Sequence, residues 1–355
     1  MKIFSKNTVT VIILSLLLTN CKTIKPNFAS KDSKIVNEVD SLLTSLNQKG
    51  EFNGNVLIAK DDKIIYNNGF GFNNGDKKIL LSVTDKFNIG SIYKEIPAIA
   101  IMQLEEKGLL NLNDPIKNHL ENFPNWSNHV TILNLLQYTS GLPKINWGKH
   151  REINDEALMN DLLEITDLEF SPGEGYLYTN YSPFLLSKIV ESISSKSFPE
   201  YVTQNILKPL ELNHSTFNKS FPYQDRRSMA ISFDSNFIED NPPFILKSSI
   251  FLFSTTTEDL FKLLKNLYSY RIIEKNSIHT IGKTVDLDIE NMESALGQIN
   301  YQENQIIEHT HHGSSGNYEC LINKDRINNT TIIIFTNSKN SNVHSIKNSI
   351  QEMLT

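Results

Sequence analysis

The chain has 355 residues, 39% of them hydrophobic and 21% charged, which is typical of a globular protein with one large domain or two smaller ones. Its net charge is −6 and no dense run of lysine and arginine occurs, so the composition argues against a nucleic acid partner. The two cysteines, Cys21 and Cys320, are not needed as a disulfide at this chain length.

Residues 1–20 are typical of a secretory signal, with two lysines before an apolar run that is too short to span a membrane. The run ends in Leu18-Thr19-Asn20-Cys21, which resembles the bacterial lipoprotein box, although Asn20 departs from the usual small residue. We expect Cys21 to carry a lipid anchor in the cell envelope, and residues 21–33 to form a polar tether. The alternative is an ordinary cleaved signal with an incidental cysteine.

The first elements after the tether are a helix, a hairpin and a second helix. Apolar residues recur at helical spacing over 35–46. Two β-rich runs, 55–59 and 63–66, flank Asp61-Asp62 and predict a hairpin. A further helical pattern begins near Ser91 and ends at Gly108, and Pro97 should kink it or mark a restart.

The middle of the chain is predicted to be mostly helical from residue 150 to about 270, after a short helix over 131–137. One helix is expected to start at Ser182-Pro183, with the serine as its N-cap. The sequence Ser254-Thr255-Thr256-Thr257 is expected to start another.

Strand-like runs return at 295–301, 318–323 and 330–335, and a helical spacing over 343–353 closes the chain. Strands at both ends predict one antiparallel sheet of about five strands within a mixed α/β (α+β) fold. The sheet would be built from 34–90 and 293–355, with 91–292 inserted as a helical region. Both terminal helices should pack on this sheet.

Ser91 and Lys94 stand three residues apart at the point where sheet gives way to helices. On a helix this spacing places both side chains on one face. A serine hydroxyl becomes nucleophilic when a base takes its proton, and a desolvated lysine has a lowered pKa that suits this role. The pair alone also fits two surface residues one turn apart.

Two further motifs carry polar groups suited to the same chemistry. In Tyr178-Thr179-Asn180 the tyrosine suits acid–base catalysis, and the asparagine suits binding of a substrate amide or orientation of the lysine. The bland alternative is a buried tyrosine beside a turn. In His311-His312-Gly313-Ser314, placed just before a strand, we expect the glycine to allow close approach of substrate and the histidine to hold its carbonyl or carboxylate. A metal cluster of His309, His311 and His312 is the weaker interpretation.

In the order Ser-x-x-Lys, Tyr-x-Asn and His-x-Gly, these motifs resemble the penicillin-recognising serine hydrolases, in the branch with class C β-lactamases, D-Ala-D-Ala carboxypeptidases, D-amino-acid peptidases and esterases. The resemblance covers about 35–354. It is supported by Gly108-Leu109-Leu110-Asn111-Leu112-Asn113-Asp114-Pro115, Thr139-Ser140-Gly141-Leu142 and Phe170-Ser171-Pro172-Gly173-Glu174.

The resemblance implies a role for each motif residue. Ser91 would be the acylated nucleophile, Lys94 its base, and Tyr178 the group that assists proton transfer. Asn180 would hold Lys94 and substrate, and His311 would replace the lysine of a Lys-Thr-Gly form. The backbone N–H groups of Ser91 and Ser314 would form the oxyanion hole.

Four departures from the family pattern affect the expected cleft. Tyr93 stands where a small residue is usual, and Tyr138 stands where histidine is usual. Ile250 and Phe251 occupy the region of an expected Gly-Gly pair, and the loop 313–316 is one residue short. These changes bear on substrate class more than on mechanism.

We therefore predict an exported, lipid-anchored serine hydrolase of the cell envelope that needs no metal or organic cofactor. Expected substrates are D-amino-acid peptides, muropeptide-like amides or small esters. The alternatives are a weakly catalytic protein that binds cell-wall peptides, and a true β-lactamase.

Overall fold

The computed structural model describes residues 30–354. The predicted signal, Cys21 and most of the predicted tether therefore lie outside the described residues. The remaining part of the tether differs from the prediction, because helix α1 (Ser30–Gln48) already begins at Ser30.

A six-stranded antiparallel sheet forms the centre of the molecule, in the order β2-β1-β11-β10-β9-β8. The antiparallel α+β prediction is confirmed, and the sheet is one strand larger than expected. Its strands are β1 (Gly54–Lys60), β2 (Lys63–Phe70), β8 (Gln298–Gln302), β9 (Gln305–Ser315), β10 (Tyr318–Asp325) and β11 (Thr330–Thr336). The predicted hairpin is confirmed, and Asp61 and Asp62 have φ angles of 51° and 56°, as a tight two-residue turn requires.

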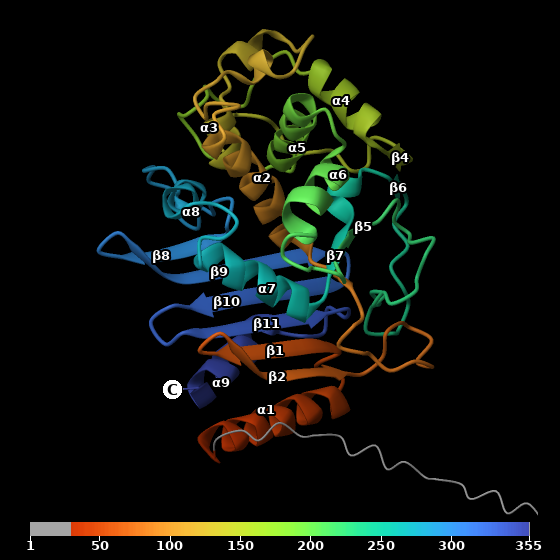
Figure 1. Cartoon of the computed structure of the whole chain (residues 1–355). Coiled ribbons are helices and arrows are strands. Elements are labelled where there is room, and N and C mark those ends of the chain that lie inside the picture. Colours follow the sequence, from red (N-terminus) through yellow and green to blue (C-terminus); the bar gives the residue numbers. More distant parts are fainter. Residues whose placement is uncertain (1–29, 355) are drawn as a thin grey trace, which may run out of the picture.

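The terminal helices α1 and α9 (Val343–Leu354) cover one face of the sheet, as predicted (Figure 1). Their apolar stripes meet the buried residues of β1, β10 and β11. The cluster is formed by Ile35, Val39, Leu43, Val56, Ile58, Leu321, Ile332, Ile334, Val343, Ile346 and Ile350, among others. The two ends of the described chain are therefore joined through one apolar layer.

The opposite face is covered by α7 (Thr257–Tyr268), which crosses β1 and β11 (Figure 1). The helical region predicted over 91–292 is therefore interrupted, because α7 lies on the sheet. The other helices and short helical turns are η1 (Gly90–Lys94), α2 (Glu95–Glu106), η2 (Ile116–Asn118), η3 (Asn125–Asn128), α3 (Ile132–Leu136), α4 (Asp155–Leu163), α5 (Tyr181–Ser194), α6 (Phe198–Val202), η4 (Thr203–Leu207), η5 (Ser249–Leu252) and α8 (Lys275–Gly282).

The prediction of mostly helical structure over 150–270 is wrong for the stretch between η4 and α7. That stretch contains loops and the short strands β5 (Thr216–Phe217), β6 (Ile245–Leu246) and β7 (Phe253–Thr255); β3 (Phe87–Asn88) and β4 (Glu152–Ile153) complete two small sheets. Ser182 is also not an N-cap, because α5 begins at Tyr181. The next helix does have a capping threonine, since Thr256 accepts a hydrogen bond from Asp259 N.

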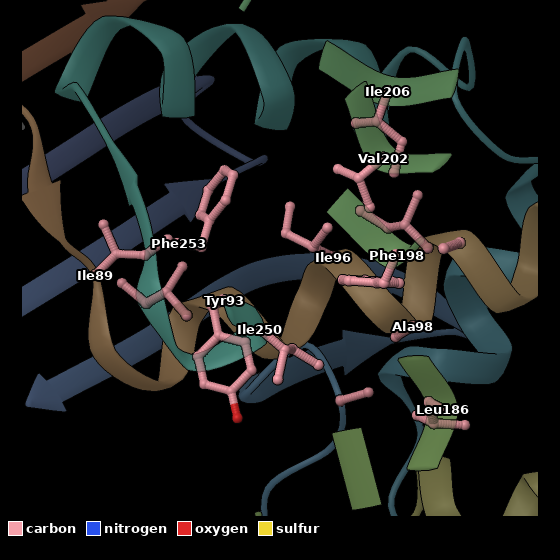
Figure 2. Packing of buried hydrophobic residues seen from close by; sticks show 14 of the residues in the cluster. Ile89, Tyr93, Ile96, Ala98, Leu186, Phe198, Val202, Ile206, Ile250 and Phe253 are labelled. Atoms are coloured by element: carbon pink, nitrogen blue, oxygen red, sulfur yellow. The ribbon is translucent and has the colours of Figure 1, made fainter. Parts of the chain in front are cut away.

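A second apolar core surrounds α2 and fills the helical region. Figure 2 shows Ile96 and Ala98 of α2 near Phe198 and Val202 of α6, with the Tyr93 hydroxyl pointing away from this cluster. This apolar core holds the first turn of α2 in place against α6. Within residues 30–354, every helix is too short or too polar to cross a bilayer.

Candidate active site

The Ser91 and Lys94 side chains meet on the short 3-10 turn η1 that leads into α2. Lys94 Nζ lies 2.9 Å from Ser91 Oγ, a hydrogen-bond distance. The α-helix itself starts at Glu95, so Pro97 falls in its first turn, where a missing N–H is tolerated. The predicted restart of the helix is confirmed, and it leaves Ser91 on the turn that precedes it.

Lys94 is almost completely buried, with an exposed fraction of 3%. Burial lowers the pKa of its ammonium from the ordinary 10.5 to about 7, although the negative charge of Glu293 opposes this shift. A large fraction of Lys94 is therefore a neutral amine near neutral pH. The residue meets the electrostatic requirement for a base beside a hydroxyl nucleophile.

Tyr178 lies against the same lysine. Lys94 Nζ is 4.6 Å from the centre of the Tyr178 ring, and the ring of Tyr138 packs against that of Tyr178 with 4.8 Å between the ring centres. Burial raises the pKa of the Tyr178 hydroxyl well above its ordinary value, and nearby Ser91 lowers it in part. The hydroxyl makes no hydrogen bond of normal geometry with any described residue, so it remains available to a ligand. Tyr138, the second departure from the family pattern, thus serves as packing for Tyr178.

Asn180 lies beside the cavity near Ser91, where it accepts a hydrogen bond of 3.4 Å from the Tyr93 hydroxyl. Tyr93 also lines this cavity, and its ring packs edge-on against Phe251 at 5.7 Å. Tyr93 and Phe251, two of the residues that depart from the family pattern, are therefore neighbours on the cavity wall.

His311 differs from the prediction in both secondary structure and environment. It lies within β9 rather than in a loop, it is 2% exposed, and it is not among the residues that line the cavity. Its Nδ1 is 2.8 Å from Glu95 Oε1, and His309 Nε2 is 3.2 Å from the same oxygen. Burial alone would raise the pKa of the Glu95 carboxyl, but the two histidines outweigh it and hold that pKa below its ordinary value. His312 points to the other side of the strand, 2.5 Å from Glu319, so the three histidines do not form one cluster.

Gly313 also has a different role from the predicted one. A Cβ atom at this position would lie 2.0 Å from the Ile89 carbonyl oxygen and 3.0 Å from Ser91 N. Gly90, with φ of +51°, would likewise bring a Cβ to 2.4 Å from Ser314 N. The two glycines therefore allow the backbone before Ser91 to pack directly on β9, rather than allowing substrate to approach. Their packing brings the Ser91 and Ser314 backbones together.

A cavity of about 280 Å³ opens at Ser91 and Lys94, close to the lower size of small-molecule sites. It is lined by Asn88, Gly90, Ser91, Tyr93, Lys94, Trp147, Asn180, Phe244, Leu246, Phe251, Ser314, Ser315 and Gly316. Five of these side chains are aromatic or aliphatic.

Several lining residues were missed by the sequence analysis. Asn88 accepts a hydrogen bond of 2.9 Å from Gly90 N and donates one of 3.3 Å to the Phe251 carbonyl oxygen, so it holds the turn before Ser91 in place. Its position two residues before a glycine was a weak signal. Trp147 and Phe244 come from loops far apart in the sequence, and no local pattern connects them to Ser91.

A family model described as Beta-lactamase matches residues 39–354. The chain belongs to this family. The membership agrees with the predicted resemblance to the penicillin-recognising serine hydrolases, and it covers both the sheet and the helical region.

The chain is also similar to individual proteins and solved structures. Protein flp of Staphylococcus aureus (strain MW2) is 29% identical over 271 residues, which are 74% of this chain and 53% of that protein. The chain thus spans about half the length of the curated relatives of this kind that it matches. Among solved structures, a penicillin binding protein from Bacillus halodurans aligns with a TM-score of 0.75 at 22% identity, covering 88% of this chain and 98% of that one. D-amino acid amidase from Ochrobactrum anthropi SV3 aligns with a TM-score of 0.74 at 14% identity, covering 90% of this chain and 98% of that one. These two likenesses concern the fold.

Proposed function

We propose that the protein is a serine hydrolase that cleaves amide or ester bonds through an acyl-enzyme on Ser91. The observation that carries the proposal is the 2.9 Å contact between Ser91 Oγ and the buried Lys94 Nζ at the base of a cavity. Neutral Lys94 takes the hydroxyl proton as Oγ attacks the substrate carbonyl, and the leaving group departs with a proton. Water then cleaves the acyl–Ser91 ester and restores the hydroxyl.

The other groups of the site would assist these steps. Tyr178 would carry protons to the leaving group and from the attacking water. The N–H groups of Ser91 and Ser314 would bind the oxyanion, and the close packing of Gly90 on the Ser314 backbone supports this arrangement. Removing such a donor typically costs about 2.7–4 kcal/mol in transition-state stabilisation. The burial of His311 against Glu95 leaves it out of this mechanism.

The cavity favours a substrate with an apolar acyl group. Trp147, Phe244 and Phe251 line it, and Lys94 is its one charged lining residue among residues 30–354. Because the Lys94 nitrogen already contacts Ser91, a substrate carboxylate would find no free cation on the cavity wall. We therefore propose small esters and D-amino-acid amides or peptides with an apolar acyl residue as substrates, ahead of peptides that end in a free carboxylate beside the reacting bond.

The test is labelling with a fluorophosphonate, followed by mass mapping and by hydrolysis of a series of p-nitrophenyl esters. We expect one adduct on Ser91, a burst of nitrophenol, and faster acylation by phenylacetyl than by succinyl ester. Ser91→Ala should lose both adduct and turnover, and full activity in this variant would refute the mechanism. A stable Ser91 adduct without turnover would support the weakly catalytic binding protein, and rapid hydrolysis of a chromogenic cephalosporin would support a β-lactamase.

We also propose that the protein is exported and held on the envelope membrane by a lipid on Cys21. The support is the sequence Leu18-Thr19-Asn20-Cys21 at the end of the apolar run.

A further inference from the structure

Three ionisable side chains are buried together between the first turn of α2 and the middle of β9. They are Glu95, His309 and His311, with exposed fractions of 0%, 0% and 2%. One oxygen or nitrogen atom from each lies within 4.8 Å of the others. The cluster is separate from the cavity, because none of the three lines it.

Several polar atoms in this cluster have no hydrogen-bond partner among residues 30–354. They are Glu95 Oε2 and His309 Nδ1, whereas His309 Nε2 lies 3.2 Å from Glu95 Oε1 without the geometry of a hydrogen bond. The hydroxyl of Tyr268, whose ring packs against that of His309 at 5.8 Å, also has no partner within this part of the chain. Buried polar groups are nearly always paired, and an unpaired set of this size indicates a bound ion or water. A buried carboxylate beside two imidazoles favours a cation over water.

We propose that Glu95, His309 and His311 bind a divalent transition-metal ion, for which zinc is the best match. Ligand atoms on a tetrahedral zinc ion, at about 2.0–2.1 Å from the metal, are about 3.3–3.4 Å from each other. Glu95 Oε1 is already 2.8 Å from His311 Nδ1 and 3.2 Å from His309 Nε2. The nitrogens of the two imidazoles lie within 4.8 Å of each other, so bringing them to the same separation requires movement of up to about 1.5 Å. Two imidazoles and one carboxylate leave the fourth position for a water.

The position of this site defines its role. Glu95 follows Lys94 directly in the chain, and His311 lies two residues before Gly313, the residue that packs on Ile89. An ion bound here would join α2, which directly follows the turn that carries the nucleophile, to the strand that carries Ser314. It would stabilise the fold and the spacing of the two backbones without contacting the substrate, so the inference is independent of the proposed hydrolase activity.

The test is zinc binding by the purified protein after treatment with EDTA and dialysis. One equivalent of zinc chloride is added, excess metal is removed by gel filtration, and the bound metal and the Tm are measured. We expect one zinc ion per chain and a Tm that rises on loading. His309→Gln and Glu95→Gln should weaken zinc binding at least tenfold and abolish the rise in Tm. The matched control is His312→Gln, a partly exposed histidine of the same strand, which should bind zinc as wild type does.

X-ray absorption at the zinc edge of the loaded wild-type protein provides a measurement that does not depend on how the variants fold. The proposal expects two imidazoles and a carboxylate oxygen in the first coordination shell. Failure of the wild type to retain stoichiometric zinc would overturn it. A shell without imidazole, or equal binding by folded His309→Gln and wild type, would do the same.

Discussion

Replacing Lys94 by methionine should make the protein more stable while it abolishes turnover. Methionine has a similar length and carries no charge. Burial lowers the pKa of Lys94 from 10.5 to about 7, so at pH 7 the folded state holds this group less favourably than the unfolded state by about 4 kcal/mol. The variant loses the hydrogen bond from Lys94 to Ser91, which reduces its gain in stability by about 1 kcal/mol. The expected net gain in the free energy of unfolding is about 3 kcal/mol.

The pH dependence gives this prediction a definite sign. A lysine whose folded pKa is depressed destabilises the protein fully below the folded pKa, and the cost disappears as pH rises towards the unfolded pKa. Between pH 7 and pH 10 the unfolded chain binds more protons at this position, so the stability of the wild type should rise relative to Lys94→Met. The advantage of the variant should fall by about 3 kcal/mol over this range.

The assay is urea denaturation of both proteins at pH 7 and pH 10, with EDTA present throughout so that no bound metal ion affects the comparison. The control is Lys107→Met, at an exposed position just after α2, which should show no comparable gain. A Lys94→Met variant that is less stable than wild type at pH 7, or whose difference from wild type is the same at both pH values, would refute the reasoning.

The remaining predictions concern the rate and the location of the protein. In EDTA-treated enzyme, kcat/KM for an ester should rise about tenfold from pH 6 to pH 8 as Lys94 loses its proton, and a flat profile would argue against Lys94 as the base. Tyr178→Phe should slow turnover by about 10²–10⁴-fold with an unchanged Tm, because its hydroxyl bonds to no described residue; full activity would remove Tyr178 from the mechanism. Cys21→Ala should move the protein from the membrane to the soluble fraction, and a wild type that is already soluble after export would contradict the anchor.

Short-range patterns in the sequence were sufficient for the Ser91–Lys94 pair and for the hairpin. The spacing of three residues places both side chains together on any helical turn, and the Asp61-Asp62 turn is set by local backbone preferences. The terminal helices were also predictable, because each has an apolar stripe that needs an apolar partner, and the strands at both ends of the chain offer one.

The strand β9 was not predictable in the same way. Its central residues, from Glu308 to His312, are polar, so the segment lacks the branched and aromatic residues that mark strands. Its polar side chains are accommodated by distant partners, as when His311 meets Glu95. The residues of the cavity wall could not be predicted for a related reason, since Trp147 and Phe244 meet only after folding.

The two halves of the site come from parts of the chain that are far apart in sequence. Gly90, in the turn that carries the nucleophile, packs on the Ser314 backbone of β9, and β9 joins the sheet through β10 and β11. The β1–β2 hairpin can form early, whereas the surface on which Gly90 packs is not synthesised until residue 316 has been added. Hydrolytic competence should therefore arise in a single late step of folding, and a partly synthesised chain that already contains Ser91 and Lys94 should remain inert.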